Sequence, residues 1–222
     1  VSVNRLQKQL TFERFLARIF HDSERWVLKG GYALELRSPG HARATRDLDL
    51  NVPPPAEEDL LDELQRVADV EARLDGRRFD RFPLDVGQGD VMVREPDRVS
   101  GQVDLSFAGL DAPKFPVYPL EDHFAEKLHA YTTPRENRSR VKDLVDMLLL
   151  IELGLGATGL LRRSIEATFE RYARHTLPEV LPEPPGGWRD AFAQLAAEVD
   201  LPVGELDEAY ERLQAFFARV VG

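Results

Sequence analysis

Residues 26–52 constrain this chain more than any other stretch, because they place two acidic residues on one face of a predicted strand. In residues 46–52, RDLDLNV, apolar and polar side chains alternate strictly. Alternate residues of a strand point to the same face, so Asp47 and Asp49 are expected to lie roughly 6.5–7 Å apart along it. Aspartate is a poor strand former, so two of them in register favour a shared ligand such as a divalent cation.

A pair of glycines lies upstream of these acids, between a short apolar run at 26–28 and a predicted helix at 30–37. A strand, then Gly30 and Gly31, then a helix start lets backbone N–H groups approach a phosphate closely. Lys29 precedes the pair, and Arg46 precedes the acids. Each feature alone also has an ordinary explanation, since paired glycines often form only a tight turn and alternating acids often form only a solvated face.

Composition limits the class of protein. The 222 residues are 43% hydrophobic, which is enough for a substantial core, and they include no cysteine, which excludes disulfides and thiolate metal sites. No apolar run approaches the length of a membrane span and no signal peptide is visible, so we expect a cytoplasmic protein with no membrane partner. The net charge of −10 argues against broad, nonspecific nucleic-acid binding.

A local basic cluster nevertheless occurs between residues 135 and 142, and it includes Arg140. It is either a solvated helix start or a group that contacts phosphates.

Two strands are predicted at 91–94 and 102–107. In the second, Asp104 lies on the polar face, where it is either a third acid of the same site or a lone exposed residue of a hairpin.

Two later helices also carry charged candidates. In the helix predicted at 120–131, Lys127 lies within the apolar stripe, where a lysine needs an anionic partner unless its amine reaches solvent. We interpret it as a ligand for phosphate. In the helix predicted at 137–153, Asp143 and Asp146 share a face. They suggest an active-site wall, although one of them could simply pair with Arg140 or Lys142.

The remaining elements complete a mixed α/β pattern. Helices are predicted at 3–20, 57–74, 160–172, 188–199 and 205–220, and residues 79–89 have an irregular pattern. We therefore expect a small mixed sheet with flanking helices in residues 1–119. A helical part in residues 120–222 is expected to complete the active site.

The glycine pair, a spacer and the Asp-x-Asp strand resemble the signature of the nucleotidyltransferase superfamily, although the spacer is somewhat longer than usual. Four blocks in order resemble the AbiEii/MenT nucleotidyltransferase toxins of type IV toxin–antitoxin systems, and they cover about residues 10–155. These blocks are LKGGYAL at 28–34, RATRDLDL at 43–50, EKL at 126–128 and RVKDLVD at 140–146.

The resemblance implies transfer of a nucleotide from an NTP with Mg²⁺, an acceptor at the 3′ end of tRNA, inhibited translation and growth, and an AbiEi-like antitoxin. By position, it assigns the metal to Asp47 and Asp49, and the triphosphate to Lys127. Asp143 would be the second-half acid, with Asp104 or Asp146 as a further one. Two alternatives share the same catalytic core, namely nucleotidyl transfer to a small molecule such as an antibiotic, and kinase-like phosphotransfer.

Overall fold

The computed structural model describes residues 3–22, 25–52, 68–134 and 139–222. It divides the chain into two compact units. The first contains Val1–Gly40, Ala44–Asp90 and Pro96–Tyr118, and the second contains His41–Arg43, Val91–Glu95 and Pro119–Gly222. In the described part of the chain, no helix is long and apolar enough to cross a membrane.

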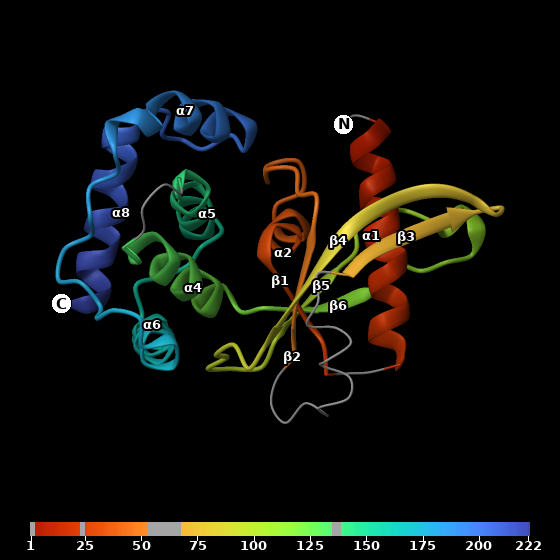
Figure 1. Ribbon diagram of the computed structural model, residues 1–222, viewed down its shortest axis with the longest axis horizontal. Helices are drawn as coiled ribbons and strands as arrows, with labels where there is room; N and C mark the ends of the chain where they lie inside the picture. The colour runs from red at the N-terminus through yellow and green to blue at the C-terminus, as the bar shows by residue number, and fades with distance from the viewer. Residues whose placement is uncertain (1–2, 23–24, 53–67, 135–138) are drawn as a thin grey trace. The chain divides into compact units, whose positions relative to one another are not determined.

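The first unit is built on a six-stranded mixed sheet, which confirms the predicted α/β class. The strand order is β3-β4-β2-β1-β6-β5 (Figure 1). β1 is antiparallel to β2 and parallel to β6, while β2 is parallel to β4. The strands are β1 Val27–Lys29, β2 Leu48–Val52, β3 Ala68–Leu74, β4 Arg77–Gln88, β5 Asp97–Ser100 and β6 Lys114–Val117.

Two helices, α1 (Val3–Asp22) and α2 (Gly30–Arg37), share one hydrophobic core with this sheet, as predicted. The ring of Phe12 meets Tyr32 of α2 edge-on at 4.9 Å between centroids, and Phe82 of β4 at 4.8 Å. Full burial of one such side chain contributes about 1.5–3 kcal/mol. The apolar residues of β2, Leu48 and Leu50, are fully buried in this core, so the alternate residues face away from it.

The β3–β4 hairpin differs from the sequence prediction. A helix was predicted at 57–74 and irregular structure at 79–89, but residues 68–74 and 77–88 are strands; residues 53–67 lie outside the described part. Asp75 and Gly76 connect the strands with φ values of +50° and +73°. This backbone is typical of a two-residue hairpin turn, in which Asp-Gly is a favoured pair. Gly76 therefore reverses the chain within a hairpin, and the helix predicted up to residue 74 was wrong for residues 68–74.

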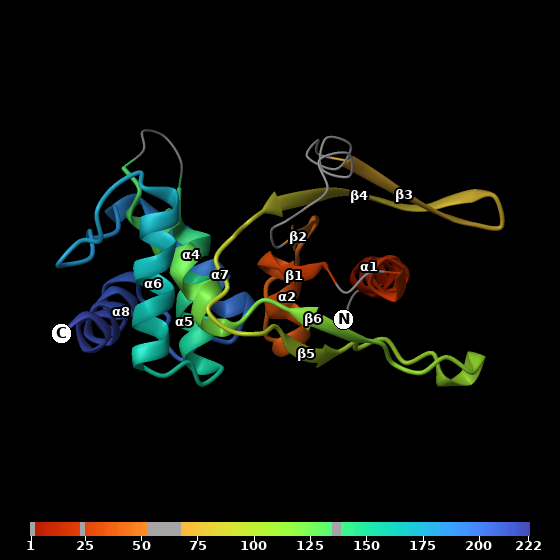
Figure 2. The same cartoon turned by 90° about the horizontal axis from the view of Figure 1, so that it is seen from below.

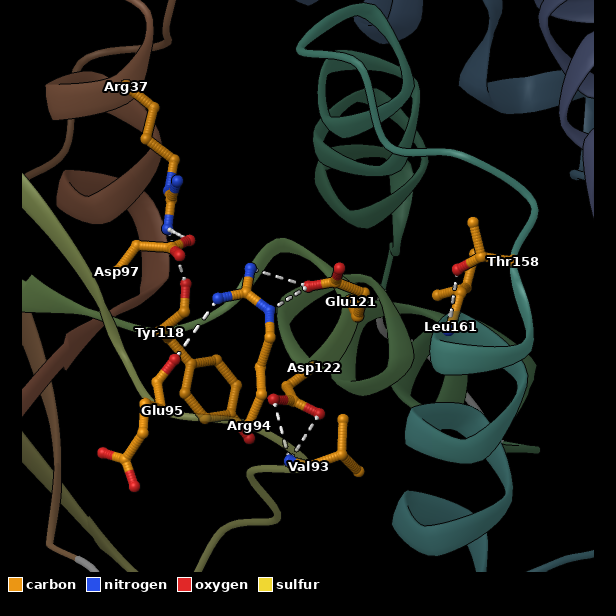
Figure 3. Close-up of polar contacts among 10 residues, drawn as sticks. All are labelled: Arg37, Val93, Arg94, Glu95, Asp97, Tyr118, Glu121, Asp122, Thr158 and Leu161. Atoms are coloured by element: carbon orange, nitrogen blue, oxygen red, sulfur yellow. Dashed lines mark hydrogen bonds and ion pairs between the residues drawn. The ribbon is translucent and has the colours of Figure 1, made fainter.

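The two strands predicted at 91–94 and 102–107 are also absent, because other groups bind their backbone amides. The Glu13 carboxylate accepts hydrogen bonds from Gln102 N (2.6 Å) and Val103 N (3.2 Å). Val93 N donates to the Asp122 carboxylate at 3.2 Å (Figure 3). An amide that donates to a side chain is not available to a sheet. The fifth strand instead occupies residues 97–100, between the two predicted strands.

The second unit is helical, and each helix predicted from residue 120 onward is present (Figures 1 and 2). The helices are α4 Leu120–Thr132, α5 Val141–Glu152, α6 Gly159–Tyr172, α7 Arg189–Glu198 and α8 Leu206–Val221. Nine of the twelve residues of α5 are buried, and it packs against α4, α7 and α8. It is therefore the central helix, as its apolar pattern predicted.

The first turn of α4 holds the segment Val91–Glu95, which belongs to the same unit (Figure 3). Arg94 pairs with Glu121 at 2.9 Å, and Asp122 accepts the Val93 amide. Burial raises the pKa of Asp122 from 3.8 to about 6, although the hydrogen bond from Val93 opposes this shift. In the first unit, Arg37 is fixed by Asp97 at 2.7 Å and by the carbonyl of Tyr118 at 3.0 Å (Figure 3).

Candidate active site

Three charged residues lie side by side on adjacent strands of the first unit. Asp49 is paired in register with Lys29 of β1 and with Asp85 of β4. Residues in register on neighbouring strands point to the same face, and neighbouring strands lie about 4.8 Å apart. The two carboxylates are therefore close neighbours. We call Lys29, Asp49 and Asp85 the charged row.

Gly30 is required where the charged row meets the start of α2. Its φ is +67°, which strains any residue with a Cβ. A Cβ built on it would overlap the Oδ2 atom of Asp49 and lie 2.8 Å from that residue's Cβ. The carboxylate thus lies directly against the helix start, where the helix dipole favours negative charge. Gly31 follows as a buried residue of the first turn.

The amine of Lys29 is held in an ion pair with Asp90. Asp90 is fixed in turn, because its backbone N–H donates to Asn51 Oδ1 at 3.2 Å. Gly87 leaves room for both side chains, since a Cβ there would lie 2.7 Å from Asp90 Oδ2 and 3.1 Å from Lys29 Nζ. Asp90 is a member of this site that sequence reasoning missed.

Asp47 does not lie on the predicted strand, because β2 begins at Leu48. It lies in a bend, where Thr45 Oγ1 donates a hydrogen bond to its Oδ1 at 2.8 Å. Arg46 is exposed in the same bend. The prediction that both acids lie on one strand was therefore wrong for Asp47.

Asp104, the predicted third acid, lacks the strand on which that prediction rested. It is fully exposed and accepts a hydrogen bond from Ser106 N at 2.9 Å, at the start of the 3₁₀ turn Ser106–Ala108. Hydrogen bonds from the Ser106 hydroxyl and amide lower the pKa of Asp104. Asp85, which sequence reasoning missed, has the neighbouring-strand position that was expected of the third acid.

A second charged group, which we call the buried ion network, lies in the helical unit. Lys127 Nζ of α4 lies 2.8 Å from Asp146 Oδ2 and 3.3 Å from Asp143 Oδ1, both on α5. Arg43 binds both carboxylate oxygens of Asp146 at 3.1 Å. Arg140 Nη1 donates to Asp143 Oδ2 at 3.1 Å. The alternative that an acid of α5 pairs with Arg140 is thus confirmed, while Lys142 is exposed.

The network keeps its charges despite burial, because opposite charges lie so close together. The Asp146 side chain is only 1% exposed. Burial alone would raise its pKa, but Lys127 and Arg43 outweigh that effect and lower it to about 2. Burial would lower the pKa of Lys127, yet Asp146 and Asp143 raise it above its ordinary value. Arg43 is a further member that the spacing of the sequence did not reveal.

The described residues contain no group of three or more histidine, cysteine, aspartate or glutamate side chains arranged to hold a metal ion. That finding is compatible with magnesium chemistry, because Mg²⁺ in nucleotide-binding enzymes commonly uses one or two carboxylates together with substrate phosphates and water. Asp49 beside Asp85 supplies hard oxygen ligands of that kind.

Comparisons with known proteins identify the family of this chain. The family model described as "Nucleotidyl transferase AbiEii toxin, Type IV TA system" matches residues 14–219. The chain belongs to this family. Membership makes the protein a nucleotidyltransferase of the toxin class, with an NTP substrate and an antitoxin partner. Comparison with curated protein sequences found no match.

Among solved structures, MenT4, a nucleotidyltransferase toxin from Mycobacterium tuberculosis H37Rv, is similar with a TM-score of 0.55 and 18% identity. The match covers 96% of this chain and 91% of that one. This likeness supports the fold. JHP933 from Helicobacter pylori has a TM-score of 0.46 and 14% identity over 100% and 90% of the two chains. An antigenic nucleotidyltransferase-like protein from Paracoccidioides brasiliensis has a TM-score of 0.45 and 16% identity over 78% and 91%.

Proposed function

We propose that this protein transfers a nucleoside monophosphate from an NTP to the 3′ end of tRNA, and that the modification inhibits translation and growth. The observation that carries the proposal is the charged row beside Gly30, in a chain of the AbiEii family. Two adjacent carboxylates next to a helix start suit a metal–triphosphate substrate.

The reaction is an in-line displacement at the α-phosphorus. The 3′ hydroxyl oxygen forms a bond to that phosphorus, the bond to the bridging oxygen breaks, and pyrophosphate leaves. Asp85 replaces Asp104 in our assignment as the acid that accepts the hydroxyl proton. Asp47 and Asp49 would hold Mg²⁺, which supplies charge neutralisation to the triphosphate.

The positive groups have a separate role in this proposal. Lys29, Arg46 and Lys127 offset phosphate charge as it shifts toward the leaving group. Asp143 and Asp146 keep Lys127 charged and fixed, which their distances of 3.3 and 2.8 Å support.

The proposal is tested by incubating the purified protein with total tRNA, Mg²⁺ and each α-³²P-labelled NTP in turn, beside an Asp49→Asn control. We expect label on tRNA that disappears in the variant and in EDTA. If label reaches a small molecule but never RNA, the acceptor is wrong. If only γ-labelled NTP transfers label, the reaction is a kinase reaction and the proposal fails.

A further inference from the structure

A pocket of about 510 Å³ lies wholly within the helical unit, beside the buried ion network. Its lining includes two aromatic residues, Tyr131 and Trp188, together with Arg140 and a proline-rich segment at 182–185. Arg140 joins the pocket to the network, because it also pairs with Asp143 at 3.1 Å. The pocket lies within the size range of small-ligand sites.

The aromatic side chains of this pocket are held in place before any ligand binds. The Tyr131 hydroxyl donates to the carbonyl of Pro182 at 2.8 Å. The rings of Tyr131 and Trp188 meet nearly edge-on, with 6.2 Å between centroids and 73° between planes. Proline fixes one backbone angle at each of its positions, so the segment opposite has little freedom. The partly exposed indole of Trp188 therefore provides a rigid flat surface.

The polar groups of the pocket disfavour a highly charged anion and leave Arg140 as the one cation among the described residues of its lining. The threonine hydroxyls at 132 and 133 donate to carbonyls of their own helix, at 2.9 and 2.6 Å. Arg140 Nε, in contrast, is buried and makes no hydrogen bond to any residue that the structure describes. Glu183 also lines the pocket and adds negative charge. Arg140 also pairs with Asp143, so its guanidinium has room for one phosphodiester charge, and these two carboxylates disfavour the several charges of a triphosphate.

From this geometry we infer that the pocket binds one unpaired nucleotide of the acceptor RNA strand, with its base stacked on Trp188 and its phosphate at Arg140. Single-stranded RNA is generally recognised by stacking of splayed bases on aromatic side chains. The inference rests on the proposed function, since it makes this pocket the place where the acceptor strand docks. A free NTP shares the same chemistry, and the experiment separates the two.

The sequence allows a direct optical test, because it contains two tryptophans, Trp26 and Trp188. Trp26 is only 7% exposed in the core of the other unit. In a Trp26→Phe protein, Trp188 is the sole indole. We expect a single-stranded RNA ending in CCA to quench its fluorescence saturably without NTP or Mg²⁺. The same RNA annealed to a complement that pairs its 3′ end, or free ATP, should quench it far less.

Variants of the full chain then measure the two contacts. Trp188→Ala should weaken binding of the CCA-ending RNA about tenfold, while Trp188→Phe keeps most of the affinity because it retains a stacking ring. Arg140→Gln should reduce the slope of log affinity against log salt by about one. Arg163→Gln is the matched control, because it makes the same charge change at an exposed position of α6 outside the pocket.

The outcomes separate this inference from the proposed function. If the RNA does not quench Trp188 and Trp188→Ala transfers label to tRNA at the normal rate, the pocket does not bind the acceptor although the function stands. If free ATP quenches as strongly as RNA, the pocket binds the donor and the inference is overturned. Quenching by RNA in a protein that labels no RNA supports the pocket and rejects the proposed reaction.

Discussion

The two units of this protein handle buried and clustered charge in opposite ways. In the helical unit, Asp146 is surrounded by cations, with Lys127 at 2.8 Å and Arg43 at 3.1 Å. In the sheet unit, Asp49 lies in register between another carboxylate, Asp85, and Lys29, whose amine pairs with Asp90. Like charges on directly opposed residues destabilise a sheet. The first arrangement stabilises the protein as it stands, whereas the second gains stability when a cation binds.

This difference indicates which acids stabilise the fold and which acids take part in catalysis. An acid that is already neutralised by fixed cations is poorly placed to bind a metal as well. An acid held next to another acid can bind a metal ion, but the repulsion between the two carboxylates lowers the stability of the protein while the metal is absent. We therefore expect substitutions in the buried ion network to lower stability most, and substitutions in the charged row to lower activity most.

The largest effect on stability is expected for Asp146→Ala. Removal of one partner from a buried ion pair costs about 3–5 kcal/mol of unfolding free energy, because it leaves Lys127 and Arg43 buried without this carboxylate. Chemical denaturation followed by circular dichroism measures the loss, with the exposed Asp207→Ala of α8, which is paired with Arg189, as a control. A loss below about 1 kcal/mol would mean that the network is not structural.

A smaller loss of stability is expected for Gly30→Ala. The positive φ alone costs about 1–3 kcal/mol, and the new Cβ displaces the Asp49 carboxylate. A displacement of that kind can lower the transfer rate about a hundredfold. Gly40→Ala is the matched control, since its φ is +82° but a Cβ there meets nothing within 4 Å. Equal activity in the two variants would contradict the role given to Gly30.

The third effect depends on pH and concerns Asp122, a buried acid at the start of α4 whose pKa is raised from 3.8 to about 6 by burial. Because the folded protein binds this proton more tightly than the unfolded chain, the residue's contribution is full below about pH 4. It is lost as the pH rises through 6. Asp122→Asn does not ionise and should gain stability relative to the wild type over that range, by at most about 3 kcal/mol. Thermal melts of both proteins from pH 4 to 8 measure this gain. If the difference in stability between variant and wild type is the same at every pH, the pKa of Asp122 is not raised.

Much of the fold could be predicted from sequence, because its signals are local. The helices at 3–22, 120–132 and 206–221 follow apolar patterns with a period of 3.6 residues, and β2 follows strict alternation. The β3–β4 hairpin was missed, although Asp75-Gly76 is a turn signal, because the apolar residues upstream also fit a helix. Pro83 within β4 added to the difficulty, since proline is rare inside strands.

The site could be predicted only in part, because its assembly depends on register and tertiary pairing. Asp49 and Gly30 follow from motif and spacing. Asp85 emerges only when the alignment of β2 with β4 is known. The predicted strand that carried Asp104 failed because the Glu13 carboxylate, about ninety residues away in sequence, binds the amides of Gln102 and Val103. No local pattern contains that contact.

The most direct test of the central claim uses one variant, Asp49→Asn, in two measurements. We predict that nucleotidyl transfer to tRNA falls at least a hundredfold, the equivalent of about 3 kcal/mol of lost transition-state stabilisation. We also predict that the unfolding free energy stays within about 0.5 kcal/mol of the wild type or rises, because a repulsion with Asp85 is removed. Full activity in this variant, or loss of activity together with unfolding, would contradict the account.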